Sequence, residues 1–205
     1  FGVAASCDGS VKGECAEESG TPMTEDDLAR LVRGDDWMMR VLRAADMVAL
    51  PDWWIGAGFL RNAVWDWLSG REPRNDADVD LVYFDAADTT AQRDWDLDAD
   101  LRQRFPFARW EVRNQARMHE RDGLPPYSST EDGIAHWVET ATCVGVRLTC
   151  GQLEFVFCHD SEDLFGLTAR PIPEFRNSER IEVFRRRVDT KGWRQRWPNL
   201  RVEEA

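Results

Sequence analysis

Apolar residues recur at helical spacing in three segments of the first third of the chain. Those at 28–32 follow Thr24, a residue type that caps helix N-termini, and predict a first helix. The stripe at 37–45 predicts a second helix. A third stripe at 59–68 predicts a helix that ends at Gly70.

Farther along, short apolar runs alternate with further helical segments. Apolar and polar side chains alternate at 78–83, which predicts a strand. The runs 144–148 and 153–157 flank a short turn and predict a β-hairpin. The other expected elements are an apolar run at 53–55, a helix at 94–104, a strand at 108–112, a helix from the Ser128 to Glu131 capping box to about residue 142, a short helix from Ser161 to Gly166, and a basic helical tail at 177–197.

This order of elements predicts an α/β (α+β) fold with a mixed β-sheet flanked by helices. The 205 residues allow one domain with appendages. We expect a disordered tail at 1–22, a core at 23–169 and a basic helical C-terminal segment at 170–205 that packs on the core. No apolar run approaches the roughly 18 residues that a membrane span needs, so we expect no membrane partner.

Charge is distributed unevenly along the chain. The formal net charge is −12, which argues against a protein that binds long nucleic acids through their phosphates. Residues 170–196 nevertheless contain nine basic and four acidic residues, or +5, and leave −17 for the remainder. A solvated helix face and a surface for phosphate or an anionic acceptor both fit this segment.

Cysteine and histidine usage indicates neither a zinc site nor a redox dithiol. The 5 cysteines include no C-x-x-C pair, and the 3 histidines are scattered. A reduced, cytoplasmic protein is the expectation that fits best.

Asp78 and Asp80 are the first candidates for chemistry. Side chains two apart on a strand share a face and stand roughly 7 Å apart, so both carboxylates point the same way. This spacing suits one divalent ion, or two ions about 4 Å apart. Surface pairs of this kind are common in acid-rich proteins, but burying aspartates within the run V-D-L-V-Y-F is costly without a compensating partner.

A glycine-rich turn before the third helix is the candidate phosphate site. Gly56, Ala57 and Gly58 precede a helix N-terminus, where free N–H groups and the helix dipole attract anions. Arg61 and Asn62 lie in the first turn of that helix. A phosphate and a neighbouring carboxylate are both suitable partners for Arg61.

Two later polar positions join the candidate site. Arg117 belongs to a polar cluster directly after a predicted strand, where open α/β sheets place ligands, although such a cluster also satisfies loop backbone groups. Glu154 is the acid inside L-E-F-V-F, and it supplies a third carboxylate if the hairpin lies beside the Asp78 strand. An edge-strand charge that faces water is the alternative.

Several stretches resemble the DNA polymerase β-like nucleotidyltransferase superfamily, and particularly a small bacterial nucleotidyltransferase-like family. The resemblance covers residues 54–200. Residues 57–62 are similar to the G-G-x-V-R-D segment of CCA-adding enzymes and poly(A) polymerases. The stretches that carry the resemblance are GAGFLRNAVWD, DVDLVYFD, WEVRNQARMH, PPYSSTEDGIAHWVETATCVGVRL, DLFGLTARP and KGWRQRWPNL.

This resemblance implies a catalytic and metal-binding set of Asp78, Asp80 and a third acid, with Mg²⁺ or Mn²⁺ as cofactor. Glu154 is the expected third acid and Glu111 the competitor. The implied reaction moves a nucleoside monophosphate from an NTP to an acceptor hydroxyl and releases pyrophosphate. The implied nucleotide-binding residues are Gly56, Ala57, Gly58, Arg61, Asn62 and Arg117.

The acceptor stays open at this point. A small molecule or a protein is favoured over RNA, because the chain is strongly acidic and shows no evident large RNA-binding domain. A nucleotide-sensing or partner-binding module that kept the fold without turnover is the alternative from a different functional class.

Overall fold

A five-stranded mixed sheet with the order β3-β2-β1-β4-β5 forms the centre of the computed structural model, which describes residues 23–176 and 178–204. β2 and β3 are parallel, whereas β1 is antiparallel to β2 and β4, and β4 is antiparallel to β5. The strands are β1 (Trp54–Gly56), β2 (Asp78–Tyr83), β3 (Arg109–Asn114), β4 (Val144–Thr149) and β5 (Gln152–Phe157). The expected mixed sheet flanked by helices is confirmed, while the tail expected at 1–22 lies outside the described residues.

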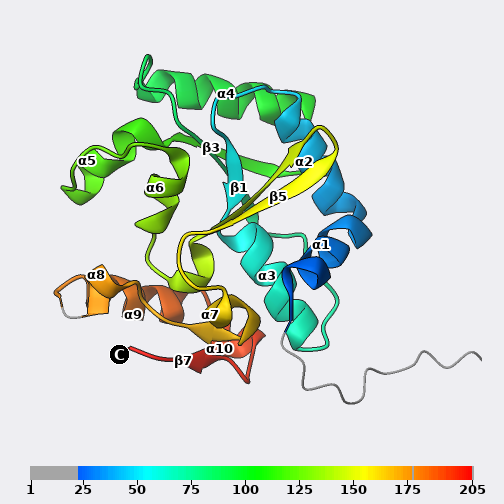
Figure 1. Cartoon of the computed structure of the whole chain (residues 1–205), viewed down its shortest axis with the longest axis vertical. Helices are drawn as coiled ribbons and strands as arrows, with labels where there is room; N and C mark the ends of the chain where they lie inside the picture. Colours follow the sequence, from blue (N-terminus) through cyan, green and yellow to red (C-terminus); the bar gives the residue numbers. More distant parts are fainter. Residues whose placement is uncertain (1–22, 177, 205) are drawn as a thin grey trace, which may run out of the picture.

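Helices surround this sheet, and the C-terminal elements gather at one end of the molecule (Figure 1). The helices are α1 (Glu25–Gly34), α2 (Asp36–Asp46), α3 (Gly58–Leu68), α4 (Ala91–Arg104), α5 (Met118–Asp122), α6 (Thr130–Ala135), α7 (Glu162–Phe165), α8 (Pro173–Arg176), α9 (Ile181–Thr190) and α10 (Trp193–Arg196). Two 3₁₀ turns lie at Gln115–Arg117 and Thr140–Thr142. No helix of the described ranges combines the length and the apolar character needed to cross a membrane.

The side chains of β2 divide between a packed face and a polar face, as the alternation predicts. Val79, Leu81 and Tyr83 are fully buried in the main core, which α2 and α3 also line. Asp78 and Asp80 lie on the opposite face. One face of the sheet therefore stabilises the fold, while the other is available for polar chemistry.

Local sequence signals placed several element boundaries correctly. Thr24 forms a capping box with Asp27, in which each side chain accepts a hydrogen bond from the backbone N–H of the other residue. The hairpin of β4 and β5 turns at Cys150 and Gly151, both with positive φ, as a two-residue turn of type I′ requires.

The helix predicted from the Ser128 capping box to about residue 142 was wrong in extent. α6 begins one residue later than expected, with Ser129 as its N-cap, and ends at Ala135 rather than near residue 142. Trp137, beyond its end, packs against Gly56 of β1, and Glu139 forms a bridge with Pro171. These tertiary contacts draw the chain out of the helix.

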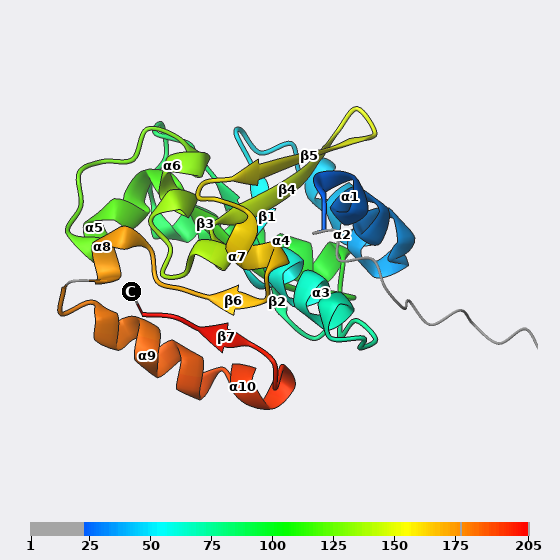
Figure 2. The same ribbon diagram turned by 60° about the horizontal axis from the view of Figure 1, so that its bottom comes forward.

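The C-terminal segment is not one helix. α8, α9 and α10 are separate, and Gly192 with a φ of 63° separates the last two. The strands β6 (Thr168–Ala169) and β7 (Arg201–Val202) then pair in parallel, and β7 lies between β6 and α9 (Figure 2). The sequence analysis did not predict β7, because a strand of two residues is too short to show an alternation of apolar and polar side chains.

Candidate active site

A cavity of about 830 Å³ lies over the polar face of β2 and β3, between the N-terminus of α3 and the C-terminal helices. The sheet contributes Asp78, Asp80, Val82, Arg109, Glu111 and Arg113. The α3 end contributes Ala57, Gly58, Arg61 and Asn62. The C-terminal segment contributes Val183, Arg187, Lys191, Trp193, Arg196 and Trp197.

Carboxylates from two neighbouring strands meet in this cavity. Asp80 pairs in register with Glu111 of β3, and Asp78 is two residues away on the same face of β2. Burial, together with the negative charges of Glu111 and Asp78, raises the pKa of Asp80 to about 6. The positive charges of Arg61 and Lys191 oppose this rise. Asp80 thus shares the cavity with both acidic and basic side chains.

Glu154 does not take the place that the sequence analysis gave it. It lies on β5, and both β1 and β4 separate that strand from β2. Its carboxylate is 2.6 Å from a guanidinium nitrogen of its cross-strand partner Arg147, and it does not line the cavity. The expectation that Glu154 stands beside Asp78 and Asp80 is therefore wrong. Glu111, the competitor, occupies that position.

The turn before α3 meets the cavity at Ala57 and Gly58. Ala57 has φ 51° and ψ −123°, a conformation that costs a non-glycine residue of order 1–3 kcal/mol. No side chain caps this helix, so its first N–H groups stay available. Gly56 has a different role, because a Cβ there would lie 2.6 Å from the Trp137 ring and 2.9 Å from the Val144 carbonyl oxygen. Gly56 allows close packing of β1 and does not itself line the cavity.

Arg61 is a buried cation without a carboxylate partner. Only 6% of its surface is exposed, and no carboxylate among the described residues forms an ion pair with it. One guanidinium nitrogen donates to Oδ1 of Asn62 at 2.9 Å, while Nε has no hydrogen-bond partner. Burial lowers the pKa of Arg61 to about 10. The sequence left a phosphate and a neighbouring carboxylate open as partners of Arg61. Among the described residues, no carboxylate forms an ion pair with it.

Three cations from the C-terminal segment, Arg187, Lys191 and Arg196, line the cavity together with Arg61. Arg187 binds the buried Glu139, with 2.6 Å between Nε and Oε1. Arg196 binds the buried Asp66, with 2.6 Å between Nη2 and Oδ2. Lys191 has no ion-pair partner within residues 23–176 and 178–204. The charge of residues 170–196 was recognised from the sequence. Their contact with this cavity was not, because they are far in sequence from the strands that line it.

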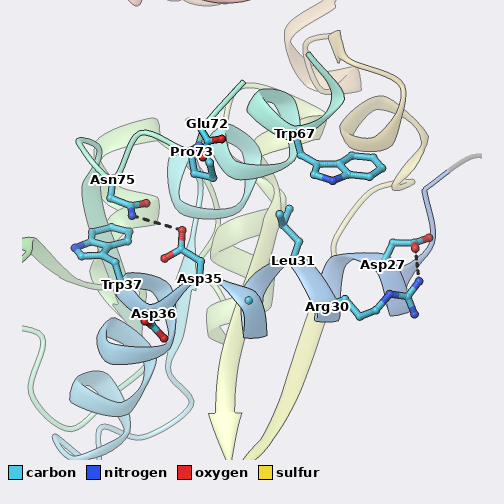
Figure 3. Close-up of a pocket in the computed structure, with 11 residues that line it drawn as sticks. Asp27, Arg30, Leu31, Asp35, Asp36, Trp37, Trp67, Glu72, Pro73 and Asn75 are labelled. Carbon is cyan, nitrogen blue, oxygen red and sulfur yellow. Dashed lines mark hydrogen bonds and ion pairs between the residues drawn. The ribbon is translucent and has the colours of Figure 1, made fainter. Parts of the chain in front are cut away.

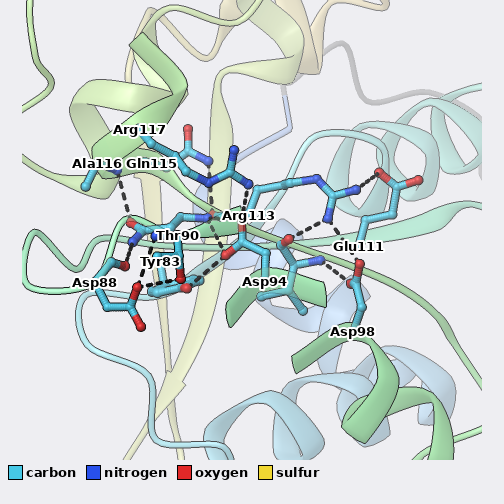
Figure 4. Close-up of polar contacts among 12 residues, drawn as sticks. Tyr83, Asp88, Thr90, Asp94, Asp98, Glu111, Arg113, Gln115, Ala116 and Arg117 are labelled. Carbon is cyan, nitrogen blue, oxygen red and sulfur yellow. Dashed lines mark hydrogen bonds and ion pairs between the residues drawn. The ribbon is translucent and has the colours of Figure 1, made fainter. Parts of the chain in front are cut away.

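Arg117 lies outside the cavity, contrary to the expectation that it lines the nucleotide site. Its guanidinium pairs with the fully buried Asp94 of α4, which also accepts a hydrogen bond from the Tyr83 hydroxyl at 2.8 Å (Figure 4). Gln115, from the same polar cluster, lines the cavity instead. Arg117 therefore joins α4 to the end of β3.

A second cavity, of about 790 Å³, lies between α1, the start of α2 and the loop after α3 (Figure 3). Trp67 and Leu31 face it, and Trp67 is 51% exposed. Asp27 and Asp35 at its margin cap α1 and α2. Neither Asp78 nor Asp80 borders this cavity, so it is separate from the carboxylate cluster.

The donor chemistry of the carboxylate cluster suits a hard divalent cation, although its side chains do not converge on one. Among the described residues, no group of three or more His, Cys, Asp or Glu is arranged to hold a metal ion. Asp78 lies 3.2 Å from Nε of Arg109, and Glu111 lies 3.8 Å from Nη2 of Arg113. A cation would offset the burial and the neighbouring negative charges that raise the pKa of Asp80, provided that Asp78 and Glu111 turn from these arginines.

Comparison with known proteins identifies one protein family. A family described as nucleotidyltransferase matches residues 43–202. No curated protein sequence shows significant similarity to the chain.

Solved structures share the fold. A structure described as an NMR structure that reveals a CCA-adding enzyme head domain has a TM-score of 0.81 and 30% sequence identity, and the match covers 89% of this chain and 97% of that one. The structure of a CCA-adding enzyme in its apo form I has a TM-score of 0.55 and 15% identity. That match covers 86% of this chain and 42% of the enzyme chain, and it supports the fold alone.

Proposed function

This chain belongs to the nucleotidyltransferase family, and we propose that it transfers a nucleoside monophosphate from an NTP to an acceptor hydroxyl. In this reaction the acceptor oxygen bonds to the α-phosphorus, the bond to the β-phosphate oxygen breaks, and pyrophosphate leaves. The hydroxyl proton passes to a carboxylate of the Asp78, Asp80 and Glu111 cluster.

The observation that carries the proposal is that acidic and basic side chains line one cavity together with Asp80. Asp78 and Glu111 provide negative charge and Arg61 and Lys191 provide positive charge, and all of them line the same cavity as Asp80. A triphosphate requires cations along its β- and γ-phosphates, whereas its reacting α-phosphate requires carboxylates that hold metal ions. This cavity offers both within one space.

The glycine turn completes the phosphate contacts in this proposal. The uncapped N-terminus of α3 directs N–H groups to the cavity, and Gly58 keeps the backbone accessible. A Cβ at Gly58 would lie 3.5 Å from both Nη2 of Arg61 and Nδ2 of Asn62. Ala57, Gly58, Arg61 and Asn62 therefore keep their predicted role as nucleotide-binding residues.

Mg²⁺ or Mn²⁺ is the proposed cofactor, and Asp78, Asp80 and Glu111 are the residues that would hold it. When bound, the metal neutralises phosphate charge and lowers the pKa of the attacking hydroxyl. The chain itself positions the triphosphate and limits its access to water through the C-terminal helices.

A small molecule or a protein is the proposed acceptor, in preference to RNA. The net charge of −12 opposes the approach of a long polyanion. Binding of RNA with a steep salt dependence, lost when Arg185, Arg186 and Arg187 are reversed to Glu, would instead favour an RNA acceptor.

Release of pyrophosphate from each NTP with Mg²⁺ or Mn²⁺ tests the proposal. We expect Asp80→Asn and Glu111→Gln each to lower the rate at least about a hundredfold, because each removes charge that stabilises the transition state. Glu154→Gln is the matched control and should retain the wild-type rate. Loss of activity in Glu154→Gln, with none in Glu111→Gln, would overturn the assignment of the third acid.

Wild-type protein that binds NTP but releases no pyrophosphate with any hydroxyl compound tested would favour the non-catalytic module.

A further inference from the structure

The C-terminal segment is fastened to the core at both sides of the cavity. Asp66 of α3 accepts hydrogen bonds from Arg196 and from the Trp197 indole N–H, the latter at 2.9 Å. Glu139 accepts from Arg187 of α9 at 2.6 Å. Both carboxylates are buried, with relative exposures of 1% and 0%. One face of this part of the chain is therefore a wall of the cavity, while its other face, with Arg185, Arg186 and Arg194, is exposed to solvent.

Trp193 of α10 stacks on Arg61. The guanidinium carbon lies 4.5 Å from the centre of the Trp193 ring, and 5.5 Å from that of Trp65. Trp193 is 2% exposed and meets Trp65 edge to face at 5.8 Å. The two rings restrict Arg61, which has no carboxylate to orient it. Trp193 thus fixes where that buried positive charge points.

Cations exceed carboxylates at this end of the cavity. The buried acids Glu139 and Asp66 neutralise Arg187 and Arg196, and they leave Arg61 and Lys191 without an ion-pair partner among the described residues. Both remaining cations line the same cavity as the carboxylates of Asp78, Asp80 and Glu111. Two cations at a cavity without an ion-pair partner among the described residues, one of them buried, match a polyanionic ligand.

We propose that the C-terminal segment supplies the second half of the triphosphate site: Lys191 binds the phosphates directly, and Trp193 is a positioning residue for Arg61. This inference deepens the proposed nucleotidyl transfer and depends on an NTP being the ligand of the cavity. It assigns binding to Lys191 and Trp193, which follow the last strand of the five-stranded sheet by more than 30 residues in sequence.

Binding of inorganic tripolyphosphate without metal, measured by calorimetry, tests the inference independently of turnover. Lys191→Ala should weaken binding about tenfold, since one charge-assisted contact is lost. Arg194→Ala is the matched control, because it removes the same charge from an exposed residue of α10 that does not line the cavity. It should leave the dissociation constant within about twofold of wild type.

Two substitutions separate the positioning role of Trp193 from a purely structural one. Trp193→Leu should weaken tripolyphosphate binding about threefold to tenfold, and Trp193→Phe should restore most of it, because a phenyl ring still stacks on the guanidinium. In steady-state kinetics Lys191→Ala should raise KM for NTP with a smaller change in kcat.

The two proposals fail in different ways. Asp80→Asn should abolish pyrophosphate release yet bind tripolyphosphate at least as tightly as wild type, because a negative charge leaves the site. Pyrophosphate release that is insensitive to Asp80→Asn would overturn the proposed function. Absence of tripolyphosphate binding by the wild type, or equal binding by Lys191→Ala and wild type, would overturn this inference.

Discussion

At the scale of single residues, Asp80 shows how neighbouring charges adjust a functional group. An aspartate in an unfolded chain titrates near pH 3.9. In the folded protein, burial and the charges of Glu111 and Asp78 raise the pKa of Asp80 to about 6. The folded state therefore binds a proton that the unfolded state releases between about pH 4 and pH 6. Its contribution to stability is present below about pH 4 and is lost as the pH rises through 6.

Replacing Asp80 by Asn should remove this pH dependence. At pH 7 the variant should be more stable than wild type by about 1 kcal/mol, since each pH unit corresponds to about 1.4 kcal/mol and solvent at this partly exposed site screens part of it. At pH 4 the two proteins should be equally stable. Urea unfolding between pH 4 and pH 8 in a metal-free buffer measures the difference. The same difference at every pH would contradict this account.

At the scale of elements, α4 protects the open edge of the sheet. β3 is one of the two edge strands, so its outward N–H and C=O groups lack a strand partner. Asp98 accepts from the Val112 N–H at 2.6 Å, and Arg102 donates to the Trp110 carbonyl oxygen at 3.0 Å. Few residues of α4 are apolar, because polar side chains that form these hydrogen bonds occupy its buried positions.

Asp98 also affects the active-site face of β3. Its carboxylate lies 3.1 Å from Arg113, whose guanidinium is 3.8 Å from Glu111 (Figure 4). Asp98→Ala should destabilise the protein by about 2–4 kcal/mol, because it leaves the Val112 N–H unsatisfied and removes the partly buried ion pair. Thermal and urea unfolding measure this loss.

Asp100→Ala on the same helix is the control for that substitution. Asp100 and Arg104 form an exposed ion pair at 2.8 Å, which contributes at most about 0.5 kcal/mol. If Asp98→Ala were no more destabilising than Asp100→Ala, the proposed protection of the β3 edge would be wrong.

At the scale of the whole molecule, the active-site cavity depends on contacts between residues far apart in the sequence. Asp66 of α3 holds Arg196 and Trp197, and the parallel pair of β6 and β7 fastens the chain end. The family match at 43–202 includes this segment, so the sheet and the C-terminal wall belong to one unit.

Asp66→Ala should release the C-terminal segment. Without this carboxylate, Arg196 and the Trp197 indole N–H lose their buried hydrogen-bond acceptor. The free energy of unfolding should fall by about 3–5 kcal/mol. Trypsin should then cleave after Lys191, Arg194 or Arg196 faster than in wild type, as followed by mass spectrometry. Asp189→Asn, an exposed change on α9, should leave the cleavage rate unchanged. Uniform cleavage along the whole chain would indicate global unfolding rather than local release.

The sequence by itself determined the local features of this protein. Period-two alternation placed Asp78 and Asp80 on one face of a strand, and the glycines before the third helix indicated its free N-terminus. Helix caps, turns and the hairpin follow from interactions within a few residues, so they can be recognised in a short stretch of sequence. The prediction of a mixed sheet and the family resemblance both depend on such short stretches of sequence.

The tertiary structure alone decided which distant residues meet. Glu111 and Glu154 each lie in a short strand, and only the strand order puts Glu111 beside Asp80 and removes Glu154 to the far edge. The same holds for Trp193, which stacks on Arg61, and for Lys191, which lines the same cavity, because the buried acceptors Asp66 and Glu139 hold the C-terminal segment there. Alternation along a strand fixes the face of a side chain, but the neighbours across a sheet depend on long-range packing.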